Sequence, residues 1–285
     1  MARQITTFLD GRTFLEGPRW RGNTLFVSDM HAHEVIAVDA NGTVAVVARL
    51  DGPPSGLGWL PDGRMLIVSM DDRRVLRREP DGSLVEHADL SSWSRHQIND
   101  MVVDRHGHAF VGHMGYDLHG GGGAGAQPAA LLRVDTDGSV HEAADALRVA
   151  NGMAVATDDR TLVVAESAGK DLVAFDVADD GRLSNRRVWA ELPDYPDGIC
   201  IDADDGVWIA CPVGDRFIRV VEGGAVTDEI PVEGRHAIAC ALGGADGRTL
   251  FMLTAPTLGD PDASRERMGA RIEVTKVDTP GCERP

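Results

Sequence analysis

Four residues that bind hard metal ions well stand at equivalent places in a repeating sequence pattern. Six times a short apolar segment has the same kind of opening, at Glu16-Gly17, Ser55-Gly56, Asn99-Asp100, Asn151-Gly152, Asp197-Gly198 and Ala237-Ile238. Successive openings are 39, 44, 52, 46 and 40 positions apart. Two carboxylates and two amide carbonyls, from Glu16, Asn99, Asn151 and Asp197, are the oxygen ligands that hard divalent cations prefer. If the six segments converge on one axis, these side chains form a site for one cation.

The expected ion is Ca²⁺, and Mg²⁺, Mn²⁺ or Zn²⁺ can accept the same ligands. The competing interpretation is that Asn-Gly and Asp-Gly are only turn residues, because both adopt positive φ at little cost. For a single position the two interpretations are equally good. Four ligand types in register across separate repeats favour the cation site.

The elements that must position these residues are short strands. A repeat of 40 to 50 residues is typical of propellers, and turn pairs such as Asp62-Gly63 and Asp81-Gly82 suit tight hairpins. Each repeat reads as four strands, so the sequence predicts an all-β, six-bladed β-propeller with four antiparallel strands per blade in a single domain, residues 1–285. The expected blades are residues 15–50, 54–92, 98–146, 150–192, 196–234 and 237–278.

Three segments fall outside the regular repeat. We expect residues 4–9 to add a strand to the last blade, because a closed ring leaves no sheet edge. Residues 258–269 lengthen the sixth blade, and residues 116–128 lengthen the third with a glycine tract. That tract lacks the Lys-Ser or Lys-Thr of a phosphate loop. A flap over the central site and a plain mobile loop both remain open for residues 116–128.

Composition excludes several classes of partner. The net charge of −17 over 285 residues argues against binding a nucleic-acid backbone. No apolar run approaches the roughly 20 residues of a membrane helix, and the N-terminus lacks the apolar core of a signal peptide. The four cysteines form no C-x-x-C pair, which argues against structural zinc and a disulfide framework. The sequence therefore predicts a cytoplasmic protein that binds no membrane.

Five short motifs are spread along the chain at Leu15-Glu16-Gly17-Pro18, Ile98-Asn99-Asp100, Ala150-Asn151-Gly152-Met153, Pro196-Asp197-Gly198-Ile199 and Val207-Trp208-Ile209-Ala210-Cys211. In this order and spacing they resemble the motifs of the senescence marker protein/gluconolactonase/luciferin-regenerating enzyme (regucalcin-like) family. The resemblance extends from about residue 14 to residue 278. It implies a six-bladed propeller with one divalent cation held by Glu16, Asn99, Asn151 and Asp197. It also implies lactone hydrolysis, with Asp197 as general base as well as ligand.

Three further residues are predicted to contact substrate. By the resemblance, Gln97 stands where sugar lactonases often carry an arginine, and Asp117 is the nearest equivalent of an acid that contacts substrate. His113 ends a strand in the third blade and can face the channel. Because Gln97 lacks the charged fork of arginine, a gluconolactone-like substrate is in doubt. The segment 31–34, which also contains histidines, follows a strand and is expected to be a surface loop, with contact to substrate as the alternative.

The leading hypothesis is a metal-dependent hydrolase that opens a small lactone. The cation polarises the carbonyl, and Asp197 accepts the proton of the attacking water. A serine-hydrolase mechanism is disfavoured because the chain has no G-x-S-x-G motif. Two alternatives stay open: a non-hydrolytic biosynthetic reaction on the same cation site, and a non-catalytic cation-binding or interaction propeller. The sequence does not decide between a monomer and a small homo-oligomer.

Overall fold

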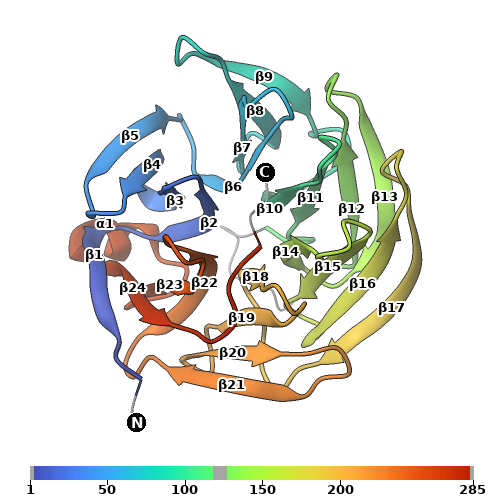
Figure 1. Ribbon diagram of the computed structural model, residues 1–285. Coiled ribbons are helices and arrows are strands. Elements are labelled where there is room, and N and C mark those ends of the chain that lie inside the picture. The colour runs from blue at the N-terminus through green and yellow to red at the C-terminus, as the bar shows by residue number, and fades with distance from the viewer. Residues whose placement is uncertain (1–2, 118–126, 283–285) are drawn as a thin grey trace.

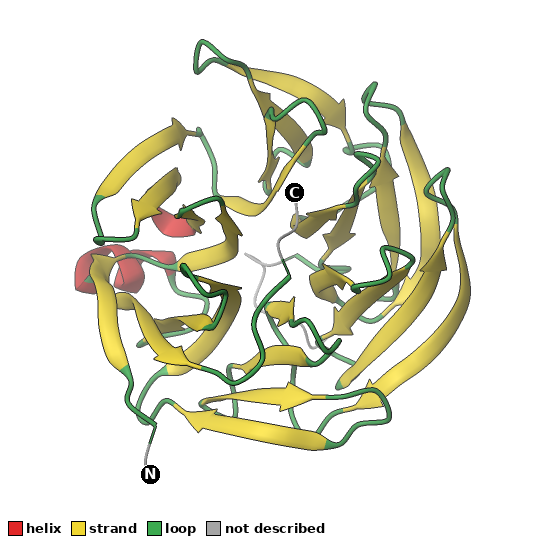
Figure 2. Ribbon diagram, in the orientation of Figure 1, coloured by secondary structure: helices red, strands yellow, loops and turns green. Residues whose placement is uncertain are grey.

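Six four-stranded antiparallel sheets surround a central axis in the computed structural model, which describes residues 3–117 and 127–282 (Figure 1). Strands make up nearly all of the regular structure, and the helical segments lie together at one edge of the ring (Figure 2). The predicted six-bladed propeller with four strands per blade is confirmed.

The strands follow one another from the channel to the outside of each blade. Blades one and two contain β2 (Leu15–Arg21), β3 (Thr24–Asp29), β4 (Glu34–Asp39), β5 (Val44–Arg49), β6 (Pro54–Trp59), β7 (Met65–Ser69), β8 (Arg74–Arg78) and β9 (Leu84–Asp89). Blades three and four contain β10 (Ile98–Val103), β11 (Ala109–His113), β12 (Ala129–Val134), β13 (Val140–Leu147), β14 (Ala150–Val155), β15 (Thr161–Glu166), β16 (Asp171–Val177) and β17 (Leu183–Glu191). Blades five and six contain β18 (Ile199–Ile201), β19 (Val207–Cys211), β20 (Arg216–Val220), β21 (Val226–Pro231), β22 (His236–Gly243), β23 (Thr249–Ala255), β24 (Ala270–Lys276) and β1 (Thr6–Arg12).

The apolar core lies between neighbouring blades. The second strands, such as β7, β11 and β19, are buried along their whole length, because each blade is covered on both faces. Val35 of the first blade packs with Leu57 and Ile67 of the second in one of these layers. The outermost strands, such as β5 and β21, have mostly exposed side chains. This gradient explains why continuous apolar runs in the sequence mark the second strands.

The two ends of the chain meet in the sixth blade. Strand β1 pairs antiparallel with β24, so the sheet order is β1-β24-β23-β22 and the ring is closed. The guanidinium of Arg3 adds two hydrogen bonds to the carboxylate of Asp228 on β21, at 2.8 and 2.7 Å. The N-terminal segment therefore connects the sixth blade to the fifth.

The insertion in the sixth blade contains a short helix, α1 (Pro261–Arg267), which the sequence analysis did not predict. Asp260 caps it by accepting a hydrogen bond from the Ala263 N–H at 2.9 Å. The helix packs on the 3₁₀ turn η1 (Met30–Ala32), where Arg265 Nε donates to the His31 carbonyl at 3.0 Å. Among the described residues, no helix is long and apolar enough to cross a membrane. Residues 116–128, for which a flap and a plain loop were both left open, lie mostly outside the described residues.

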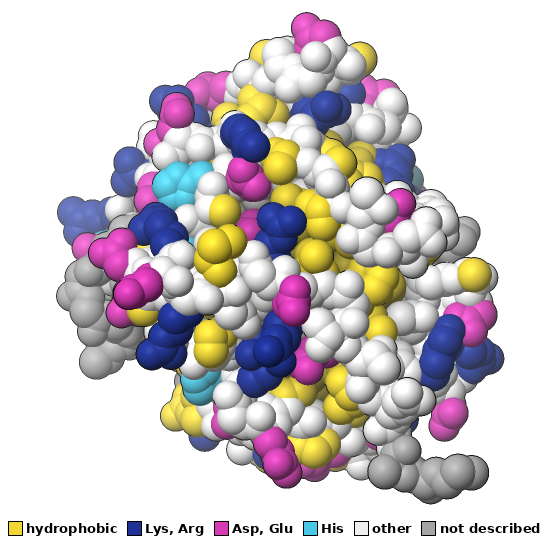
Figure 3. All heavy atoms as spheres, turned by 90° about the vertical axis from the view of Figure 1, so that its left-hand side faces the viewer, with side chains coloured by type: hydrophobic (Ala, Val, Ile, Leu, Met, Phe, Trp, Pro, Cys, Tyr) yellow, Lys and Arg dark blue, Asp and Glu magenta, His cyan; other side chains and the backbone are white. Residues whose placement is uncertain are grey.

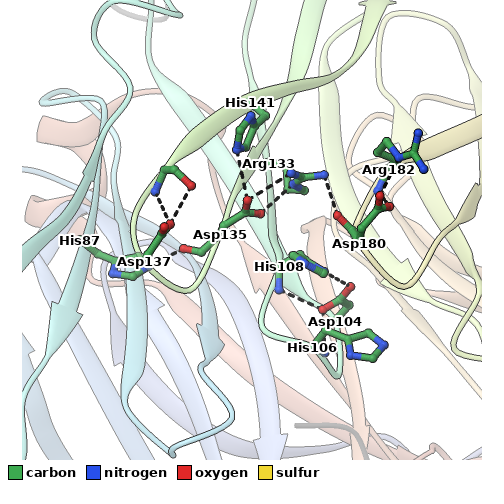
Figure 4. Close-up of polar contacts among 11 residues, drawn as sticks. His87, Asp104, His106, His108, Arg133, Asp135, Asp137, His141, Asp180 and Arg182 are labelled. Carbon is green, nitrogen blue, oxygen red and sulfur yellow. Dashed lines mark hydrogen bonds and ion pairs between the residues drawn. The ribbon is translucent and has the colours of Figure 1, made fainter.

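Turn aspartates connect the blades at the rim where the inner strands end (Figure 4). Arg133 Nε donates to Asp135 at 2.7 Å, and Arg133 NH1 reaches the carbonyl of Asp180 in the fourth blade at 2.9 Å. His87 Nε2 lies 3.2 Å from the Asp135 carbonyl and links the second blade to the third. Within its own hairpin, the Asp137 carboxylate accepts a hydrogen bond from the Ser139 N–H. The hairpin residues at this rim therefore have a structural role.

Acidic and basic side chains are interspersed over the face of the molecule on which α1 and β1 lie (Figure 3). Arg49 of β5 forms an ion pair with Glu34 of β4 at the molecular surface. Exposed pairs of this kind contribute little to stability. The negative net charge is therefore not gathered into one acidic patch on this face.

Candidate functional site

The openings of the inner strands face one end of the central channel. Glu16 lies on β2, Asn99 on β10 and Asn151 on β14, and Asp197 lies two residues before β18. All four side chains line one cavity of ≈ 280 Å³. The structure therefore brings the four predicted ligands, which span 181 positions of sequence from residue 16 to residue 197, to one place.

Irregular pairing at these openings turns the side chains toward the channel. In blades one, two, three, four and six, the register between the inner strand and its neighbour shifts at the opening. Such bulges bend a strand and re-aim its side chains. The sequence did not reveal these bulges, because the openings of the third and sixth blades contain no glycine and the glycine opening of the fifth blade has a regular register.

Glycines at the openings also allow adjacent inner strands to approach closely. A Cβ atom on Gly152 would lie only 2.5 Å from Ile199 N and 2.6 Å from the Asp197 carbonyl oxygen. The Gly152 N–H instead donates to that carbonyl at 3.2 Å, and the Gly198 N–H donates to Ile238 O at 2.9 Å. Close backbone contact between neighbouring blades therefore sets the distance between the candidate ligands.

Hydrogen bonds link the polar side chains into one chain. Ser55 Oγ donates to Asn99 Oδ1 at 3.1 Å, and Asn99 Nδ2 donates to Asn151 Oδ1 at 3.0 Å. Asn151 Nδ2 donates to Asp197 Oδ1 at 2.6 Å and lies 3.2 Å from Ser167 Oγ. Asn151 is thus the central member of the chain and fixes the orientation of Asp197.

The carboxylates of the cavity are poorly solvated. Burial raises the pKa of Glu16 well above its usual range, and the nearby Asp197 and Asp100 raise it further. Burial raises the pKa of Asp197 to about 7, although the hydrogen bond from Asn151 favours its charged form. Arg19 pairs with Asp100 at 2.9 Å. Among the described residues, no basic side chain forms an ion pair with Glu16 or Asp197.

This donor set fits a hard divalent cation. Two unpaired, desolvated carboxylates repel each other, and a cation between them removes that cost. The amide oxygens of Asn99 and Asn151 each accept one hydrogen bond and keep a second lone pair. Within residues 3–117 and 127–282, no three His, Cys, Asp or Glu side chains group as metal ligands, so a bound ion needs the amide oxygens. An all-oxygen site of this kind suits Ca²⁺, Mg²⁺ or Mn²⁺.

Aromatic residues that the sequence analysis did not select also line the cavity. The chain has two tyrosines, Tyr116 and Tyr195, and both lie here. Burial, together with the charge of Asp197, raises the pKa of Tyr116. His31 is buried in the same cavity with its ring centroid 4.9 Å from that of Phe14, so its prediction as a surface-loop residue was wrong. No motif marked these positions, because each lies in a loop after a strand.

The three predicted substrate contacts are not among the described residues that line the cavity. Gln97 lies directly before β10, and Asp117 is exposed. His113 is buried, and its Nε2 accepts a hydrogen bond from the Ala130 N–H at 3.1 Å. Burial lowers the pKa of His113 to about 4, with a further contribution from His96. Substrate contact by these three residues stays a prediction.

Comparison with known proteins identifies the family. Residues 14–256 match the model of the SMP-30/gluconolactonase/LRE-like region. Regucalcin of Homo sapiens is 26% identical over 284 residues, covering 93% of this chain and 92% of that protein. A pentonolactonase of Haloferax volcanii is 28% identical over 202 residues, covering 70% of this chain and 66% of that protein.

Solved structures agree on the fold. A luciferin-regenerating enzyme superposes with a TM-score of 0.84 at 20% identity, covering 99% of this chain and 98% of that one. A gluconolactonase of Xanthomonas campestris superposes with a TM-score of 0.78 at 24% identity, covering 97% and 90%. The family model spans most of the chain, which confirms the resemblance seen in the motifs. The chain therefore belongs to the SMP-30/gluconolactonase/LRE-like family.

Proposed function

We propose that this protein is a hydrolase that opens a small lactone and depends on one divalent cation in the propeller channel. The observation that carries the proposal is the convergence of Glu16, Asn99, Asn151 and Asp197 in one buried cavity. Two relatives support the reaction class, because one is named a gluconolactonase and another a pentonolactonase. Family membership adds to this support.

The cation would be held by Glu16, Asn99, Asn151 and Asp197, and when bound it supplies Lewis-acid polarisation of the lactone carbonyl. The side chains have separate tasks around it. The described residues supply a hydrogen bond to Asp197 Oδ1 only, from Asn151, so Oδ2 is left to accept the proton of the attacking water. Asp197 then returns this proton to the alkoxide of the opened ring.

Tyr116 is placed to assist at the ring. Its phenol is protonated at neutral pH, as in any tyrosine whose pKa is not lowered, so the hydroxyl can donate a hydrogen bond to a substrate oxygen in the cavity. Glu16 and Asn99 are only 8% and 6% exposed, so little bulk water reaches this depth. Electrostatic contacts with substrate are stronger in such an environment than in water.

Metal analysis of the purified protein followed by a lactone panel tests this proposal. We expect turnover that disappears with a chelator and returns with Ca²⁺, Mg²⁺, Mn²⁺ or Zn²⁺. Asp197→Asn is expected to lower kcat/KM by about 10²–10⁴-fold, the range for loss of a general base. Asp180→Asn, at an exposed turn on the opposite rim, is the control and should match the wild type.

Other outcomes would overturn the proposal in distinct ways. If the metal-loaded protein opens no lactone but converts another metabolite without hydrolysis, the cation site serves a non-hydrolytic reaction. If it retains metal, turns over no small molecule and binds a stable protein partner, the propeller is a cation-binding interaction module. Mass spectrometry of a metabolite mixture and of co-purified proteins distinguishes these results.

A further inference from the structure

One position is equivalent in all six blades, and in five of them it lines the cavity. It is the residue directly after the second strand of each blade, and its occupants are Met30, Met70, Met114, Ser167, Pro212 and Pro256. The first five line the cavity. Three consecutive blades thus present a methionine at the same place.

Backbone hydrogen bonds show that these positions are fixed by the fold. In four blades the N–H of this residue donates to the carbonyl of the residue directly before the inner strand, with the pairs Met30–Phe14 at 2.7 Å, Met70–Pro53 at 3.0 Å, Met114–Gln97 at 3.0 Å and Ser167–Val149 at 3.0 Å. These hydrogen bonds join backbone atoms, so they form with any of the side chains found at this position. The side chain can therefore differ between blades and determine what the cavity binds.

Most of the large apolar side chains of the cavity come from the first three blades, where they lie beside the polar Glu16, His31 and Asn99. Met30, Met70 and Met114 are 7%, 1% and 7% exposed, and Phe14 and Leu258 extend the same surface. We call these five residues the apolar wall. The fourth and fifth blades instead contribute Asn151, Ser167, Tyr195 and Asp197. None of the described residues that line the cavity is a lysine or an arginine.

A second hollow continues from the apolar wall toward α1. Its volume is ≈ 200 Å³, and it shares Met30, His31, Met70 and Gly259 with the central cavity. Pro53 and Pro261 add further apolar surface, and the polar lining of this hollow consists of His33, Asp71 and Arg265 beside His31. The unbranched, polarisable side chain of methionine adapts to ligands of irregular shape. A substrate larger than a bare lactone ring therefore has room beside the first two blades.

We propose that the substrate is a lactone with an apolar substituent of several carbons, which lies against the apolar wall; this inference rests on the proposed lactone hydrolysis. The ring lies near Asp197, and the substituent extends past Met30 and Met70. A carboxylate or phosphate held against the methionines would lose its hydration, and the described residues that line the central cavity include no lysine or arginine to pair with it. The hydroxyls of a sugar would face methionine side chains and lose hydrogen bonds made in water.

Three lactones test the substrate class on the metal-loaded wild type: γ-nonalactone, γ-butyrolactone and glucono-δ-lactone. We expect kcat/KM for γ-nonalactone to exceed that for γ-butyrolactone by about tenfold or more, because one methylene alone in an apolar pocket can contribute about tenfold. Glucono-δ-lactone is expected to be a poorer substrate than γ-nonalactone. A preference for glucono-δ-lactone would overturn the inference and leave lactone hydrolysis intact.

Variants of the wall locate the preference. Met70→Gln and Met114→Gln keep the side-chain length and add a polar end, so we expect each to lower the ratio of kcat/KM for the long over the short lactone by at least about fivefold. Met65→Gln is the matched control, because Met65 is 6% exposed in the core between the first two blades and does not line the cavity. Its ratio should stay within about twofold of the wild type. The ratio does not depend on the fraction of folded enzyme, so loss of stability cannot imitate the effect.

Binding separates this inference from the proposed function. Titration calorimetry with metal-loaded Asp197→Asn should show γ-nonalactone binding at least about tenfold more tightly than glucono-δ-lactone, and Met70→Gln should remove the difference. If this holds but no lactone is opened by the wild type, the apolar wall is supported and hydrolysis is overturned. If γ-nonalactone binds no more tightly than the sugar lactone, the substrate class is wrong whatever the turnover.

Discussion

Arg19 reaches from the first blade to Asp100 of the third, and this contact decides which carboxylates of the channel lack a partner. The guanidinium binds the Asp100 carboxylate at 2.9 Å and the Met101 carbonyl at 2.5 Å. Glu16 and Asp197 remain without such a partner among the described residues, and they are the two acids that the sequence pattern selected. The pattern could show these acids because each stands before a glycine. It could not show Arg19, because that residue reaches the channel from within β2.

His113 offers a prediction about pH at the residue scale. Burial lowers its pKa to about 4 in the folded protein, against 6.5 for an ordinary histidine. Below pH 6.5 the unfolded chain therefore takes up a proton that the folded protein does not, so the free energy of unfolding falls as the pH decreases from 6.5 to 4. Between pH 8 and pH 5 this single group removes about 2 kcal/mol.

His113→Gln should reduce that loss, since glutamine does not titrate and its carbonyl can still accept from the Ala130 N–H. Urea unfolding at pH 8 and pH 5 measures the effect, with His106→Gln at an exposed turn as the control. Wild type and variant share all other titratable groups, so the contributions of those groups cancel when the changes in the free energy of unfolding between pH 8 and pH 5 are compared. An equal loss of stability in His113→Gln and wild type would show that the buried imidazole is not responsible.

At the scale of elements, the openings of the inner strands were predictable and the loops that follow the second strands were not. Four of the six openings combine a glycine with a polar or acidic residue before an apolar run, and all six recur at intervals of 39 to 52 positions. The helix α1 had a local signal, Asp260 followed by Pro261, but its seven residues are too few for a helical period to show. The methionines of the apolar wall follow apolar strands, where a methionine looks like an ordinary core residue. Their shared position at the cavity becomes visible only when the equivalent backbone hydrogen bonds of the blades are compared.

Gly152 makes the close approach of two inner strands testable. A methyl group there would come within 2.5 Å of Ile199 N, so Gly152→Ala must push the fourth and fifth blades apart. We expect a loss of about 1–3 kcal/mol in the free energy of unfolding, the usual cost of overpacking. The affinity for the divalent cation should fall as well, because Asn151 and Asp197 move apart.

Gly52→Ala is the matched control for this substitution. A Cβ at Gly52 would meet nothing nearer than Asp71 Cβ at 3.9 Å, so the added methyl group fits without displacement. Chemical unfolding and calcium titration by calorimetry measure the two effects on both variants. If Gly152→Ala binds the cation as tightly as Gly52→Ala does, the glycine serves turn geometry alone and the spacing of the blades is set elsewhere.

At the scale of the whole molecule, the candidate ligands are distributed unevenly around the ring. They come from the first, third, fourth and fifth blades, whereas Ser55 and Ala237 stand at the openings of the second and sixth. The ring itself is closed by β1 on β24 rather than by the cation. A bound ion would therefore link four blades that are already held in place, and it would add to the stability of a preformed ring.

This arrangement predicts a characteristic change in thermal stability on cation binding. An ion that binds only the folded protein stabilises it by about 2.7 kcal/mol at 100 times its Kd, which corresponds to a rise in Tm of about 5 °C or more. Glu16→Gln removes one of the two buried acids that repel each other, so the metal-free variant should melt higher than the metal-free wild type at neutral pH. The same variant loses a ligand, so added Ca²⁺ should raise its Tm much less.

Calorimetric melting of wild type, Glu16→Gln and the control Asp180→Asn, each with chelator and with Ca²⁺, measures both effects. An equal rise in Tm in all three proteins would mean that the cation binds elsewhere. The two buried acids of the channel would then need a different partner to offset their repulsion.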